Sequence, residues 1–275
     1  MLPKFVGIGA QRAGTTWMHM CLKSHPQVFM PEGKEAHFFD ENFEKGMDWY
    51  EEMFRDAPPD ALVGEFTPNY LDSPLAIGRL AEIIPDAKLL VVLREPVSRA
   101  LSAYSLLHEQ YRGVSFREAF DRKGQLVSMG LYAQHLKRVF THFPREQVKI
   151  FLYEDIEQKP ERLLVELFQF LDIDSTYRPP ETRKRYNRIL FPESQKFLAK
   201  IGMGFVVEMV KKTPVGDLVK NYFHSRARID ALHEVEIADV SHFREAFRED
   251  ILELQEMLGR DLSAWLGEQP TMARR

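Results

Sequence analysis

The stretch Phe5-Val-Gly-Ile-Gly-Ala-Gln-Arg-Ala-Gly-Thr-Thr-Trp17 decides the fold of this chain. It predicts a short apolar strand, then a loop that contains glycine, then a helix that opens on two threonines. This order aims backbone N–H groups and a helix N-terminus at one point, which favours a bound phosphate or sulfate group. A tight strand-to-helix turn with a threonine cap would explain the same residues without a ligand.

The loop resembles a nucleoside-triphosphate P-loop, G-x-x-x-x-G-K-[ST], with one departure. Gly9 and Gly14 have the P-loop spacing, but Thr15 stands where the lysine belongs, and the basic residue lies inside the loop at Arg12. The anion cradle is therefore kept, while the group that holds a β- or γ-phosphate is rearranged.

Composition limits the classes of protein to consider. The chain has 275 residues, 44% of them hydrophobic, and a formal charge of −4. Its slight acidity argues against general nucleic-acid binding, which usually needs a basic face. The single cysteine, Cys21, excludes an intramolecular disulfide and is expected to pack in the core. No apolar run approaches 20 residues, so we expect no membrane span and a cytoplasmic location.

Apolar runs predict four strands, and helical spacing predicts helices between them. The strands are expected in the opening stretch and at residues 61–65, 88–93 and 147–152. The helices are expected at 16–24, 74–84, 96–110, 116–121, 131–143, 160–171 and 241–258. This alternation predicts an α/β fold, a P-loop-like parallel sheet flanked by helices with a helical C-terminal portion. We expect one domain over residues 1–275, with a core at about 4–190 and the helical portion at about 191–275.

Ligands of parallel sheets bind at the carboxyl ends of the strands. Arg12, Glu65 and Arg94 all fall at or just after a predicted strand end. We therefore expect these three side chains to share one crevice.

A second anion motif follows the strand at 88–93. In Arg94-Glu-Pro-Val-Ser-Arg-Ala-Leu-Ser-Ala-Tyr104, the proline suits the first turn of a helix. Ser98, Ser102 and Ser105 then recur on one helix face, where they and Arg94 can converge on an anion. The other interpretation is an exposed polar helix face with a salt-bridged arginine.

Together the two motifs resemble the sulfotransferase family that uses 3′-phosphoadenosine 5′-phosphosulfate (PAPS). Its members carry K/R-x-G-T-[ST] for the 5′-phosphosulfate and R-[DE]-P-x-x-R-x-x-S-x-[YF] for the 3′-phosphate. Four further segments resemble the branch that contains the heparan sulfate and other carbohydrate sulfotransferases. They are Gly33-Lys-Glu-Ala-His-Phe-Phe-Asp40, Gly46-Met-Asp-Trp-Tyr50, Gly64-Glu-Phe-Thr-Pro-Asn-Tyr70 and Gly130-Leu-Tyr-Ala-Gln-His-Leu136. The resemblance covers roughly residues 4 to 190.

The resemblance implies transfer of a sulfuryl group from PAPS, without a metal, to a hydroxyl or amine of a carbohydrate, lipid or other small molecule. The product is adenosine 3′,5′-bisphosphate (PAP). A donor with a separate 3′-phosphate needs a second anion site, whereas a nucleoside triphosphate does not. The implied nucleotide-binding residues are Arg12, Ala13, Gly14, Thr15, Thr16, Trp17, Arg94, Ser102, Arg183, Lys184 and Arg185.

Three residues are candidates for the chemistry. Arg12 is expected to stabilise the charge that builds on the leaving nucleotide. The resemblance assigns the base that accepts the acceptor proton to Glu35, with His37 as the runner-up because histidine titrates near neutral pH. The neighbour Lys34 is expected to bind the donor or an acidic acceptor.

The chain departs from the carbohydrate branch at Phe66, where that branch often has lysine. This weakens the case for an anionic polysaccharide acceptor, and we expect Phe66 to be part of the core. Trp49, Tyr104 and Tyr132 are aromatic candidates for adenine or acceptor contact, or for plain core packing. The alternatives to a sulfotransferase are a P-loop nucleotide kinase, which lacks its lysine here, and a non-catalytic nucleotide-binding module. The oligomeric state cannot be read from the sequence.

Overall fold

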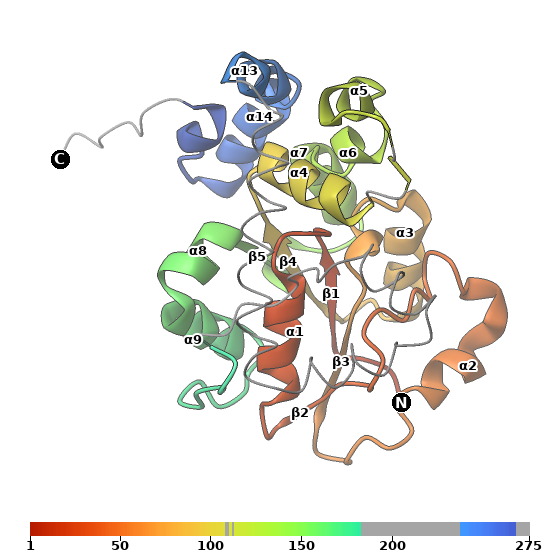
Figure 1. Cartoon of the computed structure of the whole chain (residues 1–275). Coiled ribbons are helices and arrows are strands. Elements are labelled where there is room, and N and C mark those ends of the chain that lie inside the picture. Colours follow the sequence, from red (N-terminus) through yellow and green to blue (C-terminus); the bar gives the residue numbers. More distant parts are fainter. Residues whose placement is uncertain (108–109, 112, 183–236, 268–275) are drawn as a thin grey trace, which may run out of the picture.

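The computed structural model describes residues 1–107, 110–111, 113–182 and 237–267. In these residues five parallel strands form one sheet in the order β2-β3-β1-β4-β5 (Figure 1). The strands are β1 (Phe5–Gly9), β2 (Val28–Phe29), β3 (Leu62–Phe66), β4 (Lys88–Leu93) and β5 (Val148–Leu152). The α/β fold and the four expected strands are confirmed. The sequence missed β2 because two residues are too few to show a period.

The centre of the sheet is apolar and closely packed. All five residues of β1 are buried, and Phe5 pairs with Gly64 on one side and Lys88 on the other. A Cβ atom at Gly64 would lie 2.1 Å from the Phe5 ring, so this position has room only for glycine. Buried parallel strands read as continuous apolar runs, which is why the sequence located β4 so clearly.

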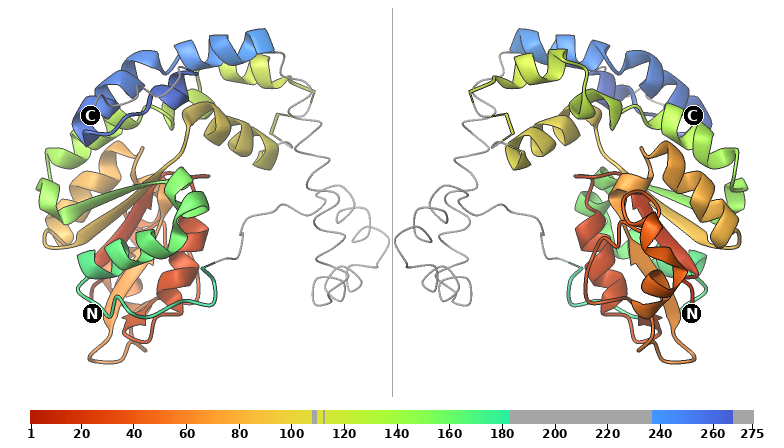
Figure 2. Two further views of the ribbon diagram at one scale, coloured as in Figure 1. Left: turned by 90° about the vertical axis from the view of Figure 1, so that its left-hand side faces the viewer. Right: turned by 90° about the vertical axis from the view of Figure 1, so that its right-hand side faces the viewer.

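Helices cover both faces of the sheet (Figure 2). On one face lie α1 (Thr15–Lys23), α8 (Tyr153–Gln158) and α9 (Pro160–Phe170), and on the other lie α3 (Pro74–Ile83) and α7 (Tyr132–Phe140). The remaining elements are α2 (Gly46–Glu52), α4 (Pro96–Leu106), α5 (Phe116–Asp121), α6 (Gln125–Ser128) and the 3₁₀ turns at Phe43–Lys45, Pro68–Tyr70, Arg145–Gln147 and Ser263–Leu266. The sequence did not predict α2, α6 or α8, each of seven residues or fewer.

The C-terminal helices differ from the prediction. Residues 241–258 were expected to form one helix, but α13 (Ile237–Glu245) and α14 (Arg248–Leu258) are separate. Phe247 lies in the break, fully buried, with its ring against Phe120 and over Gly130. The break lets this ring join the cluster formed by the rings of Phe116, Phe120 and Phe243. From α14, Asp250 accepts hydrogen bonds from the first-turn amides of α7, at Ala133 and Gln134.

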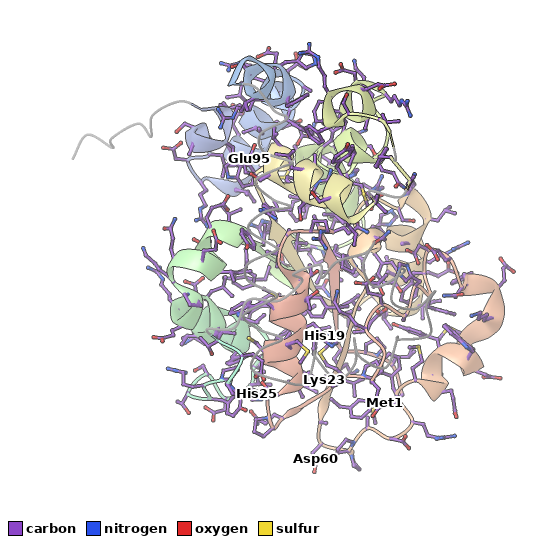
Figure 3. The ribbon with its side chains drawn as sticks, viewed as in Figure 1. Met1, His19, Lys23, His25, Asp60 and Glu95 are labelled. Atoms are coloured by element: carbon purple, nitrogen blue, oxygen red, sulfur yellow. The ribbon has the colours of Figure 1, made fainter. Side chains whose placement is uncertain are left out.

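The polarity of the sheet fixes where a ligand can bind. Figure 3 labels Met1 and Asp60, which precede β1 and β3, at one end of the molecule, and Glu95, which follows β4, at the other. The carboxyl ends of the strands therefore face the end that carries Glu95 and α4. Among the helices that the structure describes, none combines the length and the apolar character that a membrane span requires.

Candidate active site

The predicted strand–loop–helix is present at the carboxyl end of β1. Two residues of the loop have left-handed backbones, Arg12 with φ 70° and Gly14 with φ 99°. A Cβ atom at Gly14 would lie 3.0 Å from both Tyr153 and Ile156, so both conformation and space favour glycine here. The helix α1 begins immediately afterwards at Thr15. The first amides of a helix have no acceptor within it, which makes this point an anion cradle.

Hydrogen bonds join the two anion motifs directly. The Arg12 side chain donates from Nε to the hydroxyl of Ser102 over 3.0 Å. The Arg94 guanidinium donates to the carbonyl oxygen of Arg12 over 3.2 Å. The sequence assigned Arg12 to the 5′ group and Ser102 to the 3′-phosphate. The structure brings both into one contiguous group with Arg94.

This group is strongly cationic. Burial lowers the pKa of Arg12, and the positive charges of Arg94 and Arg99 lower it further. Within the described residues, neither Arg12 nor Arg94 forms an ion pair with a carboxylate. Three neighbouring guanidinium groups repel one another, and an anion bound among them would relieve that repulsion.

The first residues of α7 and α8 hold Arg94 in place. Its carbonyl accepts a hydrogen bond of 2.8 Å from the buried hydroxyl of Tyr132, and its guanidinium lies 4.6 Å from the ring centre of Tyr153. Trp265 packs edge-on against Tyr132 and donates its indole N–H to Glu154. Tyr132 therefore positions Arg94 and is too buried to stack on adenine. The sequence missed Tyr153, although its place directly after a strand was a signal.

The other predicted nucleotide residues divide into three groups. Ala13 is buried in the loop, Thr15 is buried at the start of α1, and Thr16 is half-buried. Trp17 is also buried, and its indole donates to the carbonyl of Thr182 over 3.2 Å, so the ring packs and does not stack on a base. The third group, Arg183, Lys184 and Arg185, lies outside the described residues. Trp17 thus holds the residue that directly precedes these three cations.

The segment Gly33–Asp40 carries the candidate base. Its backbone is left-handed at Glu35, with φ 73°, and at His37, with φ 48°, conformations that non-glycine residues rarely adopt. The amide of His37 donates to the Thr67 hydroxyl over 3.3 Å. Thr67 directly follows β3, the neighbour of β1, so the segment lies at the carboxyl end of the sheet.

Charges in this segment alternate in sign. The Glu35 carboxylate lies 2.5 Å from Lys34 Nζ and 3.6 Å from His37 Nε2, and His37 Nδ1 lies 3.0 Å from Asp40. Hydrogen bonding to His37, together with Lys34, lowers the pKa of Glu35 to about 2. Hydrogen bonds to Asp40 and Glu35 raise the pKa of His37 to about 10. At neutral pH Glu35 is therefore a carboxylate and His37 an imidazolium.

Comparison with known proteins shows which family the chain belongs to. The model of the sulfotransferase domain family matches residues 2–201. The chain belongs to that family. This confirms the family resemblance drawn from the two anion motifs.

Individual proteins that are similar to this chain are also named as sulfotransferases. Heparan sulfate glucosamine 3-O-sulfotransferase 3B1 of Mus musculus is 31% identical over 182 residues, 62% of this chain and 46% of the relative. The membrane-associated sulfotransferase kil1 of Dictyostelium discoideum is 26% identical over 63% of this chain and 56% of its own. The crystal structure of a sulfotransferase from Alicyclobacillus acidocaldarius superimposes with a TM-score of 0.71 at 26% identity, covering 96% of this chain and 99% of that one. The chain spans about half the length of the curated relatives it matches.

Phe66 of this sulfotransferase lies in the core, as expected. Its side chain is 1% exposed, and its ring fills the space over Gly7, where a Cβ atom would lie 2.1 Å away. The ring also meets the edge of His19 on α1. Phe66 therefore contributes packing and no charge to the site.

The two other aromatic candidates also have partners within the fold. Trp49 stacks on Phe38 and lies under the ammonium group of Lys45. Tyr104 donates to the carbonyl of Val114 and stacks on Tyr111. These contacts favour packing roles over adenine contact.

One set of side chains near the site has the donor types of a metal site. Ligand atoms of His37, Asp40 and Glu41 lie within 4.8 Å of one another. The ring Nδ1 of His37 already lies 3.0 Å from Asp40 and 3.7 Å from Glu41, so ion pairs use these donor atoms. The group orients His37 without needing a metal.

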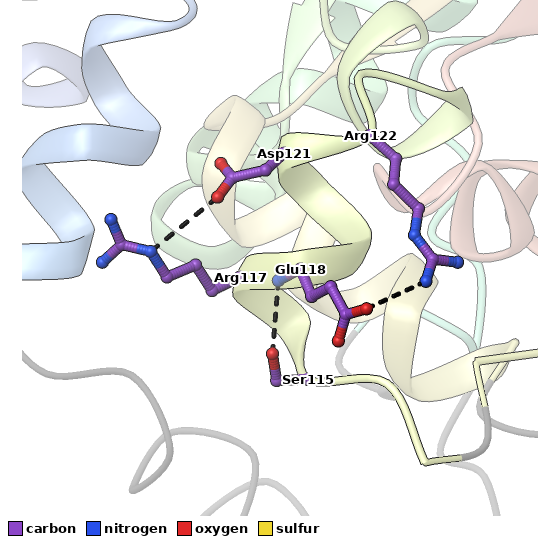
Figure 4. Close-up of a pocket in the computed structure, with 5 residues that line it drawn as sticks. All are labelled: Ser115, Arg117, Glu118, Asp121 and Arg122. Atoms are coloured by element: carbon purple, nitrogen blue, oxygen red, sulfur yellow. Dashed lines mark hydrogen bonds and ion pairs between the residues drawn. The ribbon is translucent and has the colours of Figure 1, made fainter.

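A hollow of about 430 Å³ on α5 lies apart from this site (Figure 4). Its charged side chains pair with each other, Arg117 with Asp121 and Arg122 with Glu118. This internal pairing leaves little reason for the hollow to attract a charged ligand.

Proposed function

We propose that this chain transfers a sulfuryl group from PAPS to a hydroxyl, or amine, of a carbohydrate, lipid or other small molecule. The observation that carries the proposal is the interlocked group of Arg12, Arg94 and Ser102 at the N-terminus of α1. It offers positive charge and directed donors for two anions, which suits a nucleotide with a 5′-phosphosulfate and a separate 3′-phosphate.

In this proposal the donor lies across the ends of β1 and β4. The loop amides and the hydroxyls of Thr15 and Thr16 receive the 5′-phosphosulfate. Arg94 and Ser102 receive the 3′-phosphate. Arg12 contacts Ser102 in the structure and takes part in both subsites. Because arginine stays charged, it stabilises the bridging oxygen of the leaving nucleotide by charge and hydrogen bonding, without donating a proton.

Glu35 is the proposed base. Its low pKa makes it a carboxylate, the form that accepts a proton, whereas His37 is already protonated and has no free lone pair to offer. A base of low pKa removes the proton late, once the forming O–S bond has acidified the acceptor hydroxyl. His37 then serves as the cationic neighbour that keeps Glu35 ionised, and Lys34 adds a second positive charge.

Two observations bear on the chemical class of the acceptor. Relatives named as heparan sulfate sulfotransferases favour a carbohydrate acceptor. The buried Phe66 stands where the carbohydrate branch often has lysine, so the site lacks a positive charge at this position. This favours a neutral sugar or lipid hydroxyl over a polyanion as the acceptor. The cytoplasmic location expected from the sequence stays a prediction.

The deciding experiment incubates the protein with ³⁵S-labelled PAPS and a panel of neutral glycans, sulfated glycans, lipids and phenols. Transfer of label to one class, with release of PAP, would support the proposal. Calorimetric titration should show PAP binding far more tightly than AMP or ATP. Equal affinity for AMP would contradict the two-anion site, and tighter binding of ATP with phosphoryl transfer would favour the kinase alternative.

A further inference from the structure

A fully buried glutamate, Glu65, lies at the end of β3 beneath the segment that carries Glu35. It accepts three hydrogen bonds, all from hydroxyl groups. Oε1 accepts from Tyr50 at 2.9 Å and from Tyr70 at 3.1 Å, and Oε2 accepts from Thr67 at 2.8 Å. A buried carboxylate is costly unless it is fully hydrogen-bonded, so this arrangement needs a reason.

Two of these hydroxyls also hold the segment at residues 37–39. The Tyr70 hydroxyl accepts from the amides of Phe38 at 2.9 Å and Phe39 at 3.3 Å. The Thr67 hydroxyl accepts from the amide of His37 at 3.3 Å. Glu65 is therefore linked through a single intervening hydroxyl to each of three consecutive backbone amides.

Counting protons shows why both side-chain oxygens of the residue must accept hydrogen bonds. A hydroxyl has one proton, and a backbone amide can only donate. Because Tyr70 and Thr67 accept from amides, each must direct its own proton to Glu65. These protons reach different oxygens, Oε1 and Oε2, so both oxygens must act as acceptors. In glutamine, one oxygen becomes an NH₂ group that faces a hydroxyl proton whichever way the amide turns.

The backbone of the segment Gly33–Asp40 has a strained conformation that its surroundings must hold in place. Glu35 and His37 both have positive φ, a conformation that persists only where the surroundings impose it. The side chains of Phe38 and Phe39 are buried, with the Phe38 ring stacked 4.3 Å from Tyr50. The hydroxyls of Thr67 and Tyr70 hold the backbone amides of the same segment.

We propose that Glu65 is a positioning residue that sets the place of Glu35 through Tyr70 and Thr67. The proposal rests on the proposed function, because it takes Glu35 as the base. Glu65 itself is buried away from any ligand and takes no part in the transfer.

Tyr50 and Tyr70 provide a matched pair of variants. Tyr50→Phe and Tyr70→Phe each remove one hydroxyl from the same oxygen of Glu65 and keep the ring. Only Tyr70→Phe also leaves the amides of Phe38 and Phe39 without their acceptor. With PAP bound, amide hydrogen exchange at 38–39 should quicken by about tenfold or more in Tyr70→Phe and stay near wild type in Tyr50→Phe. This readout needs no activity.

Turnover supplies the second readout. Tyr70→Phe should lower kcat by about 10–100-fold, the scale of a misplaced catalytic group, while KM for PAPS and affinity for PAP stay unchanged. Tyr50→Phe should retain most of its kcat. Thr67→Val should resemble Tyr70→Phe, and Thr67→Ser should restore turnover. Glu65→Gln should combine the losses of kcat expected for Tyr70→Phe and Thr67→Val. If Glu65→Gln does not fold, the comparison of Tyr50→Phe with Tyr70→Phe still tests the proposal.

Two results would overturn the proposal. The first is equal behaviour of the two tyrosine variants in exchange or in kcat. The second is faster exchange in Tyr70→Phe with wild-type kcat, since the segment would then be released without effect on catalysis. The Glu35→Gln variant distinguishes the positioning role of Glu65 from the assignment of Glu35 as the base. If it is inactive while Tyr70→Phe is fully active, only the positioning role fails; if Glu35→Gln is active, the base assignment fails.

Discussion

The Nε atom of Arg12 lies 3.0 Å from the hydroxyl oxygen of Ser102, across 90 residues of sequence. This contact joins the loop after β1 to the helix after β4, two of the places where a parallel sheet offers helix N-termini to a ligand. Arg94 closes the link from the other side by donating to the Arg12 carbonyl. A nucleotide with anions at both ends would meet a single connected group, and each of its parts can be tested separately.

Replacing Arg94 with alanine should weaken PAP binding by about 1.5–3 kcal/mol, the usual scale for a hydrogen bond to a charged group. The reason is loss of the guanidinium proposed to hold the 3′-phosphate. With AMP, which lacks that phosphate, the variant and the wild type should bind equally. Arg162→Ala removes the same charge from the exposed face of α9, where it pairs with Glu166, and serves as the control in calorimetry. An equal loss with PAP and AMP would show that Arg94 only supports the fold.

The serines of α4 offer a comparison within one helix. Ser102 faces Arg12, whereas the exposed Ser105 donates to the carbonyl of Leu101 in its own helix. Ser102→Ala should therefore lower the affinity for PAP by roughly tenfold, since about 1.4 kcal/mol corresponds to a factor of ten. Ser105→Ala should leave it unchanged. If both variants bind like wild type, the serine face does not contact the nucleotide.

Chelation should leave activity intact. Arg12, Arg94 and the loop amides supply the positive charge of the site, and a transferred sulfuryl group carries less charge than the phosphoryl group that kinases neutralise with Mg²⁺. The possible metal donors at His37, Asp40 and Glu41 are already in ion pairs. Turnover should be the same with EDTA and with added Mg²⁺. Loss of activity with EDTA that Mg²⁺ restores would favour a kinase.

Sequence patterns predicted the elements that local rules determine. The apolar run at 88–93, proline at the first position of α4 and glycine at position 14 each placed an element boundary within a few residues. The anion residues were predictable for the same reason, because strand ends in a parallel sheet converge.

Long-range links were not predictable from the chain. Nothing local shows that Tyr132 holds the carbonyl of Arg94, or that Glu65 has three hydroxyl partners. The side chain of Phe247 looks compatible with a continuing helix, and only its burial against Phe120 explains the break between α13 and α14. These features depend on which surfaces pack together, and a single sequence does not record this.

The pH dependence of turnover should distinguish the two candidate bases. With a pKa of about 2, Glu35 is already ionised well below neutral pH, so its proton-accepting form does not increase across the measurable range. His37, with a pKa of about 10, would accept a proton only as pH rises towards 10. If Glu35 is the base, kcat at saturating substrates should be nearly flat between about pH 5 and 9. A rate that climbs about tenfold per pH unit towards pH 10 would transfer the role to His37.

Direct replacement tests the same assignment without relying on titration. Glu35→Gln keeps the shape of the side chain but removes the lone pair that accepts the proton, so kcat should fall by about 10²–10⁴-fold. PAP affinity should change little, because in the proposed arrangement the carboxylate faces the acceptor. The control is Glu32→Gln, which neutralises an exposed carboxylate of the same loop and should leave kcat unchanged. His37→Ala completes the set. If Glu35→Gln turns over normally and His37→Ala is inactive, histidine is the base; if both are active, the proton leaves to solvent and the segment only shapes the site.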